Sequence, residues 1–411
     1  MVRDASTTIS ATASATAAAS KDGDGVRARN LARLLRRVHL DGPQSRAQLT
    51  SATGLNRSTV ADLVAELVAD GWVIERDPDP AGRVGRPSPV VEASPQTVVI
   101  AVNPEVDAVE IAAIDLAHGI AVRERIETIL PSAEAVAALV AEVLERWTRD
   151  TLRETRVVGV GVAVPGLVRQ GDGLVRNAPH LGWVDAPVRA LLATATGLPV
   201  AVGNDASLGA LAEHLFGAAR GADDVVYLNG GPSGIGGGII VHGLPVGGVG
   251  GYAGEFGQNR VRTGAEGTQG PVAVLEDEVS RARLLIALGR HAADDAALAV
   301  AIATATDLGA PDARDDASSR RDAVREECRR QRGILAPAIA DAVNILNPAV
   351  VVLGGFLAML AEVDPDGFAE AVRASAMAES VEDLRILPAS LAADRLLLGA
   401  AELAFTAAGV I

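Results

Sequence analysis

Four consecutive polar residues, Asn56-Arg57-Ser58-Thr59, have the side-chain types that read base edges in DNA. Arginine pairs with guanine and asparagine with adenine through two hydrogen bonds each, and serine and threonine hydroxyls suit bases or phosphates. The four residues precede an apolar run with helical spacing, so we expect them to form the first turn of a helix. The N-terminus of that helix would add a partial positive charge for a phosphate.

The surrounding segments predict that this helix is the second helix of a helix-turn-helix. An earlier helix with one apolar face should end at Asp41-Gly42-Pro43. A capping box of Ser45 with Gln48 opens the next helix, over 46–53, and Gly54 makes the turn. The helix that follows Asn56 has apolar residues at helical spacing, namely Val60, Leu63, Val64, Leu67 and Val68.

Two arginines in the glycine-flanked loop 82–87, Arg83 and Arg86, form a second candidate DNA contact. A strand at 72–74 and its return at 90–91 would make the loop a wing, whose arginines suit a narrow minor groove. Arg46, at the start of the preceding helix, is a further candidate. The same pattern is also typical of a small module that contacts proteins and carries a solvated hairpin loop, and that alternative stays open.

Charge divides the chain into unlike parts. Residues 26–92 hold ten arginines against eight acids, although the whole chain has a formal net charge of −15. An acidic body repels phosphate backbones, so nucleic-acid contact should be confined to the N-terminal module. Residues 1–25 have few large apolar side chains and predict a disordered tail.

Composition excludes several classes of protein. A chain with 49% hydrophobic and 22% charged residues is globular. The sequence contains no apolar run of about 18 residues, so we expect no membrane span. No signal-peptide core is visible, so we expect a cytoplasmic protein. The lone Cys328 excludes internal disulfides and multi-cysteine zinc sites, and we interpret it as incidental. An aromatic content of 2% argues against stacking platforms for single-stranded nucleic acid.

From about residue 97, short apolar runs alternate with helical stretches, which predicts an α/β body, with residues 296–320 as a surface insertion. Five motifs occur here in order: Gly203-Asn204-Asp205-Ala206, Gly234-Ile235-Gly236-Gly237-Gly238, Ala253-Gly254-Glu255-Phe256-Gly257, Leu275-Glu276, and the run 347–355 that ends in Gly354-Gly355. With them the chain resembles the ROK family of repressors and sugar kinases, specifically members with an N-terminal winged helix, over roughly residues 28–405. The resemblance implies a two-lobed, actin-like ATPase fold with a sugar in the cleft. We therefore predict a tail (1–25), a winged helix-turn-helix (26–93) and a sugar kinase-like effector domain (97–411).

The resemblance also implies a sugar site. Asp205 matches the family's catalytic base, Asn204 a sugar-hydroxyl contact, and Glu255 and Glu276 the carboxylates that accept further hydroxyl bonds. Gln258 stands where the family has a histidine and could donate one hydrogen bond. For Asn204-Asp205 a helix-capping turn, and for the two glutamates plain surface acids, remain the alternatives.

Two further family features are altered. The first phosphate turn, 101–105, lacks glycine and hydroxyls and carries Pro104 and Glu105, and the run 232–234 is Pro-Ser-Gly instead of Gly-Thr-Gly. These changes argue against ATP, so we expect Asp205 to be a sugar ligand and not a base. The family's zinc site is also lost, because Gln258 replaces its histidine and residues 263–274 contain no cysteine. We expect no cofactor and no metal.

The sequence thus predicts a DNA-binding regulator of carbohydrate-related genes, a repressor that binds a double-stranded operator and a sugar effector as a homodimer or homotetramer. An ATP-dependent sugar kinase with an added DNA-binding domain is the first alternative, and an interaction protein with a vestigial cleft is the second. The six histidines are interpreted as structural. The exception to watch is His180, whose loop, 178–183, matches a family segment near the cleft and includes Trp183 as a possible lining residue.

Overall fold

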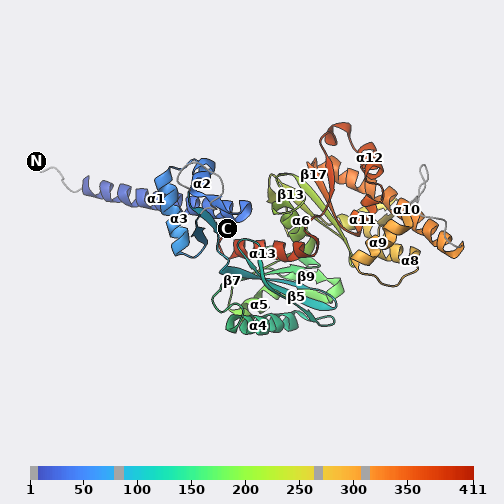
Figure 1. Ribbon diagram of the computed structural model, residues 1–411, viewed down its shortest axis with the longest axis horizontal. Helices are drawn as coiled ribbons and strands as arrows, with labels where there is room; N and C mark the ends of the chain where they lie inside the picture. The colour runs from blue at the N-terminus through green and yellow to red at the C-terminus, as the bar shows by residue number, and fades with distance from the viewer. Residues whose placement is uncertain (1–7, 78–87, 263–271, 307–314) are drawn as a thin grey trace, which may run out of the picture.

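The computed structural model describes residues 8–77, 88–262, 272–306 and 315–411, with the backbone alone at 8–24 and 315–318. A small N-terminal module is followed by two α/β lobes (Figure 1). The module contains the elements α1 (Thr8–Asp41), β1 (Gln44–Ser45), α2 (Arg46–Thr53), α3 (Arg57–Ala69), β2 (Val73–Arg76) and β3 (Val90–Ala93). Its three strands form one sheet in the order β1-β3-β2, and β2 and β3 are antiparallel. The predicted helix-turn-helix and hairpin are therefore present.

Local capping sets the ends of α2 and α3 where the sequence predicts them. Ser45 caps α2 and forms a reciprocal capping box with Gln48, and Gly54 ends the helix with a φ of 71°. The Asn56 side chain caps α3 by accepting a hydrogen bond of 2.8 Å from the Thr59 N–H. Each cap satisfies a backbone N–H that the helix leaves unpaired, so these boundaries depend on only a few neighbouring residues.

Two expectations for the module need correction. Helix α1 begins at Thr8, whereas the sequence predicted a disordered tail through residue 25. That segment is rich in alanine, the strongest helix former, which the argument from missing apolar residues overlooked. In α3 the apolar stripe is buried except for Val68, which is 40% exposed. The wing residues 82–87, including Arg83 and Arg86, lie outside the described residues.

The first lobe is a five-stranded sheet in the order β11-β7-β4-β5-β6, with α4 and α5 packed on its outer face. Its elements are β4 (Thr97–Pro104), β5 (Ala108–Asp115), β6 (Ile120–Glu127), α4 (Ala133–Arg149), β7 (Arg156–Val164), β8 (Leu167–Val168), β9 (Val175–Ala178), β10 (Trp183–Ala186), α5 (Val188–Thr196) and β11 (Val200–Asn204). Strands β4 and β5 are buried along their whole length. Near-continuous apolar runs are expected for strands covered on both faces.

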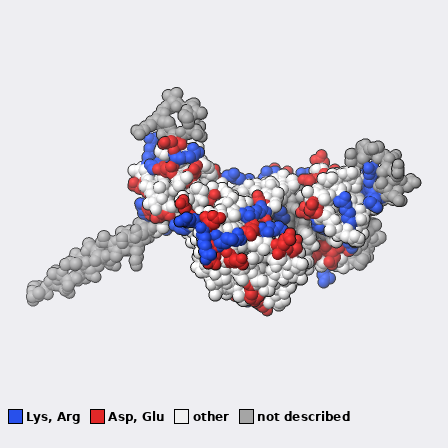
Figure 2. Space-filling model, turned by 60° about the horizontal axis from the view of Figure 1, so that its bottom comes forward, with Lys and Arg blue, Asp and Glu red and all other residues white. Residues whose placement is uncertain are grey.

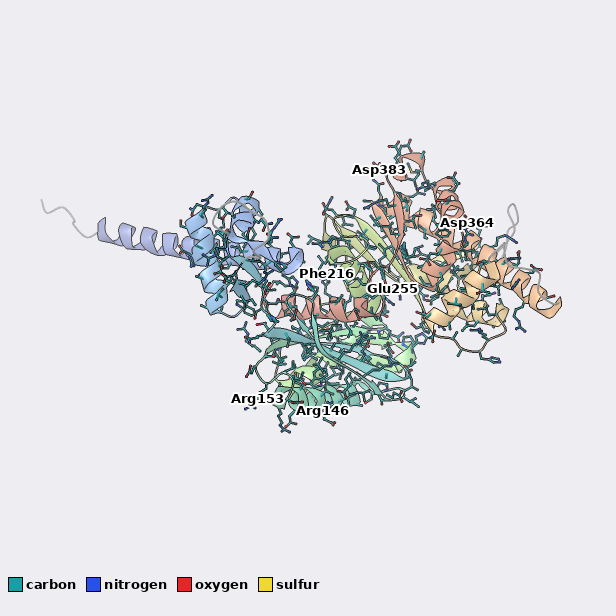
Figure 3. The ribbon with its side chains drawn as sticks, viewed as in Figure 1. Arg146, Arg153, Phe216, Glu255, Asp364 and Asp383 are labelled. Carbon is teal, nitrogen blue, oxygen red and sulfur yellow. The ribbon has the colours of Figure 1, made fainter. Side chains whose placement is uncertain are left out.

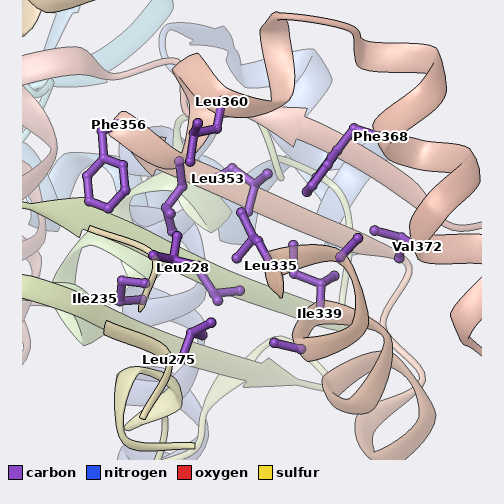
Figure 4. Packing of buried hydrophobic residues seen from close by; sticks show 14 of the residues in the cluster. Leu228, Ile235, Leu275, Leu335, Ile339, Leu353, Phe356, Leu360, Phe368 and Val372 are labelled. Carbon is purple, nitrogen blue, oxygen red and sulfur yellow. The ribbon is translucent and has the colours of Figure 1, made fainter. Parts of the chain in front are cut away.

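The second lobe is another five-stranded sheet, ordered β14-β13-β12-β17-β18. Its elements are β12 (Val225–Gly231), β13 (Gly234–Val241), β14 (Leu244–Pro245), β15 (Arg260–Arg262), β16 (Val272–Val274), α7 (Leu275–Glu278), α8 (Arg281–Ala287), α9 (Asp295–Thr306), α10 (Asp315–Leu346), β17 (Val350–Gly355), α11 (Phe356–Glu362), α12 (Pro365–Ser375) and β18 (Arg385–Pro388). Figure 4 shows Leu335 and Ile339 of α10 packed under the sheet beside Leu353 of β17.

This core corrects one reading of the sequence and agrees with another. The stretch 296–320 was predicted to be a surface insertion, yet α9 buries Leu298, Ile302 and Ala305 in the core of the second lobe. Alanine and threonine between these residues hid the helical period. Cys328 is a buried core residue of α10, and burial raises the pKa of its thiol to about 11, which makes it unreactive.

Two helices, α6 (Asp205–Leu215) and α13 (Arg395–Ala407), lie between the sheets and against each other. Helix α13 packs on β4 and β7 of the first sheet, and α6 packs on β12 and β13 of the second. The approach is close enough to require glycine: a Cβ at Gly161 would collide with the Ala400 carbonyl, and one at Gly399 with the Leu208 carbonyl. Helix α13 also shares one buried apolar cluster with α1, α2 and α3, which joins the module to the first lobe.

Candidate functional site

A cavity of about 450 Å³ lies between the lobes, and all five predicted sugar contacts line it: Asn204, Asp205, Glu255, Gln258 and Glu276. The first lobe contributes 165–167 and His180 to its wall, and the second lobe contributes 233–236. Figure 3 shows Glu255 in this region, near one end of α13. The residues come from distant parts of the sequence, and the structure brings them together on the wall of one cavity.

Asn204 and Asp205 stand where β11 ends and α6 begins. Asn204 Oδ1 caps α6 by accepting from the Ser207 N–H at 2.9 Å, and its Nδ2 donates to Gly166 O at 3.0 Å. The helix-capping turn, given above as the alternative for Asn204-Asp205, is thus present, and it orients both side chains. Asp205 Oδ1 accepts from the Ala206 N–H at 2.8 Å, which fixes its carboxylate on the cavity wall.

Three carboxylates, Asp205, Glu255 and Glu276, share the cavity, and the pKa values of Asp205 and Glu255 are raised. Burial raises the pKa of Asp205 to about 6, and the charge of Glu255 adds to the shift, although the Ala206 N–H and Arg395 oppose it. Partial burial, together with the charge of Glu276, raises the pKa of Glu255. Among the described residues that line the cavity there is no lysine or arginine. Such a wall offers acceptors to neutral hydroxyl donors and repels anions.

Gln258 and Glu276 form one unit. The Gln258 amide donates to Glu276 Oε1 at 2.5 Å, and Glu276 Oε2 accepts from the Ile235 N–H at 3.3 Å. A Cβ at Gly234, where φ is 128°, would collide with the Glu276 carboxylate, so this glycine admits the side chain. Gln258 therefore orients the acidic residue in addition to facing the cavity. Most of the stretch whose lack of cysteine predicts the loss of the family's zinc site, residues 263–271, lies outside the residues that the structure describes.

The sequence missed some lining residues. Asn177, Asn229 and Ser233 line the cavity, and they share only a position near a strand end, a weak signal in sequence. His180 lines the cavity, with Nε2 3.0 Å from the Ser233 carbonyl oxygen. Trp183 does not line it. The indole is buried under the first sheet and donates to Pro131 O at 2.8 Å.

The altered first phosphate turn is a tight β-hairpin. Glu105 and Asp107 both pair with Arg125, at 2.5 and 3.1 Å, and the Glu105 N–H is used by the Ala108 carbonyl at 2.8 Å. The Asn103 amide also donates to Glu105, at 3.0 Å. The turn presents acidic side chains where phosphate binding needs free N–H groups.

The candidate DNA-reading residues are at the start of α3. Asn56, Arg57 and Ser58 are exposed and Thr59 is half-buried. Asn56 Oδ1 is already used by Thr59 and by the Ser58 hydroxyl at 2.7 Å, which leaves Arg57 as the best placed base-reading group. Arg46 forms a two-point ion pair with Glu75, both distances 2.5 Å, so a DNA contact would have to compete with that pair. Figure 2 shows basic and acidic side chains interleaved on this module.

Two α/β lobes around a cleft, with a shared pair of central helices, define an actin-like, sugar kinase-type fold. Residues 99–407 match the model of the ROK family, and the chain belongs to that family. The match begins after the N-terminal module. Membership confirms the resemblance and the predicted fold class. No described helix is long and apolar enough to cross a membrane.

Individual relatives include regulators and enzymes. The chain is 26% identical over 372 residues to a xylose repressor of Caldicellulosiruptor bescii, covering 86% of this chain and 90% of that protein. A glucokinase of Thermotoga maritima is 31% identical over 294 residues, covering 64% of this chain and 90% of the enzyme. Among solved structures, a ROK family transcriptional regulator described as a homologue of the E. coli MLC protein has a TM-score of 0.72 at 22% identity, covering 94% and 98%. A Streptomyces griseus glucokinase with glucose and AMPPNP has a TM-score of 0.55 at 24% identity, covering 75% and 99%.

Proposed function

We propose that this protein is a DNA-binding transcriptional regulator, specifically a repressor of carbohydrate-related genes, whose effector is a neutral sugar bound between the lobes. The observation that carries the proposal is the fusion of a capped helix-turn-helix to a sugar-type cavity through one shared core. A relative named xylose repressor, which covers 86% of this chain, supports the same reading.

The charge of the cavity supports a neutral polyhydroxyl ligand. Three carboxylates and the amides of Asn177 and Gln258 supply acceptors and donors, and no basic group among the described lining residues would balance a phosphate. We therefore propose a free sugar over a sugar phosphate. Pocket shape, more than hydrogen-bond type, would select among hexoses and pentoses.

We further propose that the protein does not transfer phosphate. The hairpin at 103–108 supports this, because its acidic side chains and used N–H groups are a poor cradle for the phosphates of ATP. Asp205 would then accept a hydrogen bond from the sugar and would not act as a base.

Repression would require a paired arrangement of the modules, and we propose a homodimer or a dimer of dimers. Two reading helices on one face of DNA lie about 34 Å, or one helical turn, apart, so a modest change in their separation spoils the register. Sugar binding between the lobes would shift that separation through α6 and α13. A coupling of about 1–3 kcal/mol between sugar and operator suffices for such a switch.

The test is calorimetry of the full chain with a panel of free sugars, sugar phosphates and ATP, followed by selection of bound DNA from a random duplex library. We expect one free sugar to bind, ATP not to bind, and the sugar to change the affinity for the selected duplex. Arg57→Ala should weaken that duplex by about 1–3 kcal/mol. Equal operator affinity with and without saturating sugar would contradict the proposed regulation.

One observation favours sugar phosphorylation as a second function. Asp205 keeps the family base position, and a pKa of about 6 suits a general base near neutral pH. Relatives named glucokinase match the body of the chain. An ADP-release assay with the sugar that binds decides between the two: sustained turnover that Asp205→Asn abolishes would establish the kinase.

A further inference from the structure

Three ionisable side chains from distant parts of the chain meet where the N-terminal module joins the body. His39 lies on α1, His118 on the turn between β5 and β6, and Glu402 on α13. His39 and Glu402 are buried, and the His118 side chain is 19% exposed. His39 Nε2 lies 2.8 Å from Glu402 Oε1, and His118 Nε2 lies 3.4 Å from His39 Nε2 and 3.6 Å from Glu402 Oε1.

The hydrogen bond made by His39 Nδ1 determines whether Nε2 presents a hydrogen or a lone pair to Glu402. His39 Nδ1 lies 2.7 Å from the Leu116 carbonyl oxygen, which can only accept, so Nδ1 carries a hydrogen. In the neutral ring, Nε2 then presents a lone pair to a carboxylate oxygen that also has only lone pairs. Two acceptors at 2.8 Å need a positive charge between them, which must be a proton or a metal ion.

His118 adds a third donor atom, and its backbone is built to present it. The residue has a φ of 66°, a left-handed conformation that is costly for a side chain with a Cβ. Asp115 Oδ1 braces the turn by accepting from the Ala117 and Gly119 N–H groups, at 2.7 and 2.9 Å. A proton bridging His39 and Glu402 would not require a second imidazole at this point.

The separations suit one shared ion. Zinc–nitrogen and zinc–oxygen bonds of ~2.0–2.2 Å in a tetrahedral arrangement place ligand atoms about 3.3 Å apart. The three measured separations, 2.8, 3.4 and 3.6 Å, bracket that value. The Leu116 carbonyl is the outer hydrogen-bond partner that zinc-bound histidines usually have.

We propose that a divalent transition-metal ion, with Zn²⁺ as the best fit, binds His39 Nε2, His118 Nε2 and Glu402 Oε1. A donor set of two imidazoles and one carboxylate binds such transition-metal ions in preference to Mg²⁺ or Ca²⁺. Phe216 and Phe405 pack around the imidazoles, with ring centroids 3.9 Å from His118 and 5.9 Å from His39, and limit the motion of both rings. Figure 3 shows Phe216 beside the junction of the module with α13.

A route for the ion and a fourth ligand are available. His39 and His118 line a second cavity, of about 480 Å³, that also touches Asp41, Glu92 and Arg220. A water molecule in this cavity would complete a four-coordinate site. The site is separate from the sugar cavity and from the family's cysteine zinc site. It departs from our expectation of no metal, and it does not depend on the proposed regulation.

The test uses the full chain, stripped with a chelator and titrated with Zn²⁺ in a calorimeter and with Co²⁺ as an absorbing probe. The variant is His118→Asn, because asparagine tolerates the left-handed backbone and cannot replace the imidazole. The matched control is His242→Asn, an exposed histidine on the β13–β14 turn with a φ of 51°. Circular dichroism verifies that both variants fold.

We expect one equivalent of metal per chain, the d–d absorption of four-coordinate Co²⁺, and a rise in melting temperature on adding Zn²⁺. His118→Asn should weaken Zn²⁺ at least tenfold and abolish the melting shift, and His242→Asn should leave both unchanged. Uptake that is equal in wild type and His118→Asn would overturn the site. So would the absence of uptake at about 100 µM metal and neutral pH, since the cation would then be a proton.

Discussion

Two carboxylates on the central helices, one half-buried and one buried, show how surroundings decide the role of the same chemical group. Asp205, at the start of α6, shares its cavity with Glu255 and Glu276, and desolvation raises its pKa to about 6 although Arg395 opposes the shift. Glu402, on α13, is buried, which alone would raise its pKa, but the imidazoles of His118 and His39 lower it. The junction places two imidazoles against Glu402, whereas no lysine or arginine among the described residues lines the cavity and Arg395 offsets only part of the Asp205 shift. A carboxylate whose charge is only partly compensated suits a reversibly bound ligand. A carboxylate that is paired within the protein suits a permanent structural contact.

The largest effect should come from breaking the balanced cluster. Glu402→Ala removes the partner of the buried His39 and the half-buried His118 imidazoles and should lower the free energy of unfolding by about 3–5 kcal/mol. Urea unfolding followed by circular dichroism measures it, with the exposed Glu379→Ala as control. A loss below about 1 kcal/mol would mean that the cluster contributes no more than a surface pair.

The cavity should respond in the opposite direction. Asp205→Asn removes an unbalanced charge while its amide oxygen can still accept from Ala206, so stability at pH 7.5 should rise by about 1–3 kcal/mol, the scale of the pKa shift. Sugar affinity should fall about 10–150-fold, because a bond to a charged acceptor is worth ~1.5–3 kcal/mol. Calorimetry and urea unfolding of one preparation give both numbers. An Asp205→Asn variant that is less stable than the wild type and binds sugar normally would contradict the proposed difference between Asp205 and Glu402.

The pH dependence follows from the same shift. The folded pKa of Asp205, about 6, lies above its ordinary value of 3.8, so folding favours the protonated group. Its contribution to stability is fully present below about pH 4 and is lost as the pH rises through 6. Sugar binding needs the ionised acceptor, so affinity should increase from pH 5 to pH 7.5, by up to tenfold per unit below 6. Calorimetry at pH 5, 6 and 7.5 checks this, and Asp205→Asn should give a flat profile over this range.

The smallest effect should come from Gln258. Its amide orients Glu276, so Gln258→Ala removes one hydrogen bond worth about 0.5–1.5 kcal/mol and should weaken the sugar about 2–13-fold. Gln258→Glu should be worse, because it places a fourth carboxylate against Glu276. Calorimetry at pH 7.5 compares the two variants, and equal affinity in wild type and Gln258→Ala would mean that the Glu276 backbone contacts suffice.

How much the sequence predicted depends on how far apart the interacting residues lie. The caps of α2 and α3 involve residues three apart, and both were predicted. The family motifs gathered Asn204, Glu255 and Glu276 into one site, which no local pattern could have done. His39 and His118 were interpreted as structural, because nothing in the sequence relates them to a glutamate some 280 to 360 residues later. Trp183 was only a possible lining residue, and although the nearby His180 reaches the cavity, the Trp183 ring packs into the core of the first lobe.

The contact between α1 and α13 also determines when, during synthesis, the N-terminal module can finish folding. His39 and Glu402 are 363 residues apart, and the buried apolar cluster of the module includes α13 side chains. A ribosome adding ~5–20 residues per second needs roughly 20–70 s to travel from one to the other. During that interval the reading helix exists without its full support, and a nascent chain would be a poor competitor for DNA. The synthesis of α13 is thus the point at which the first-made module becomes complete.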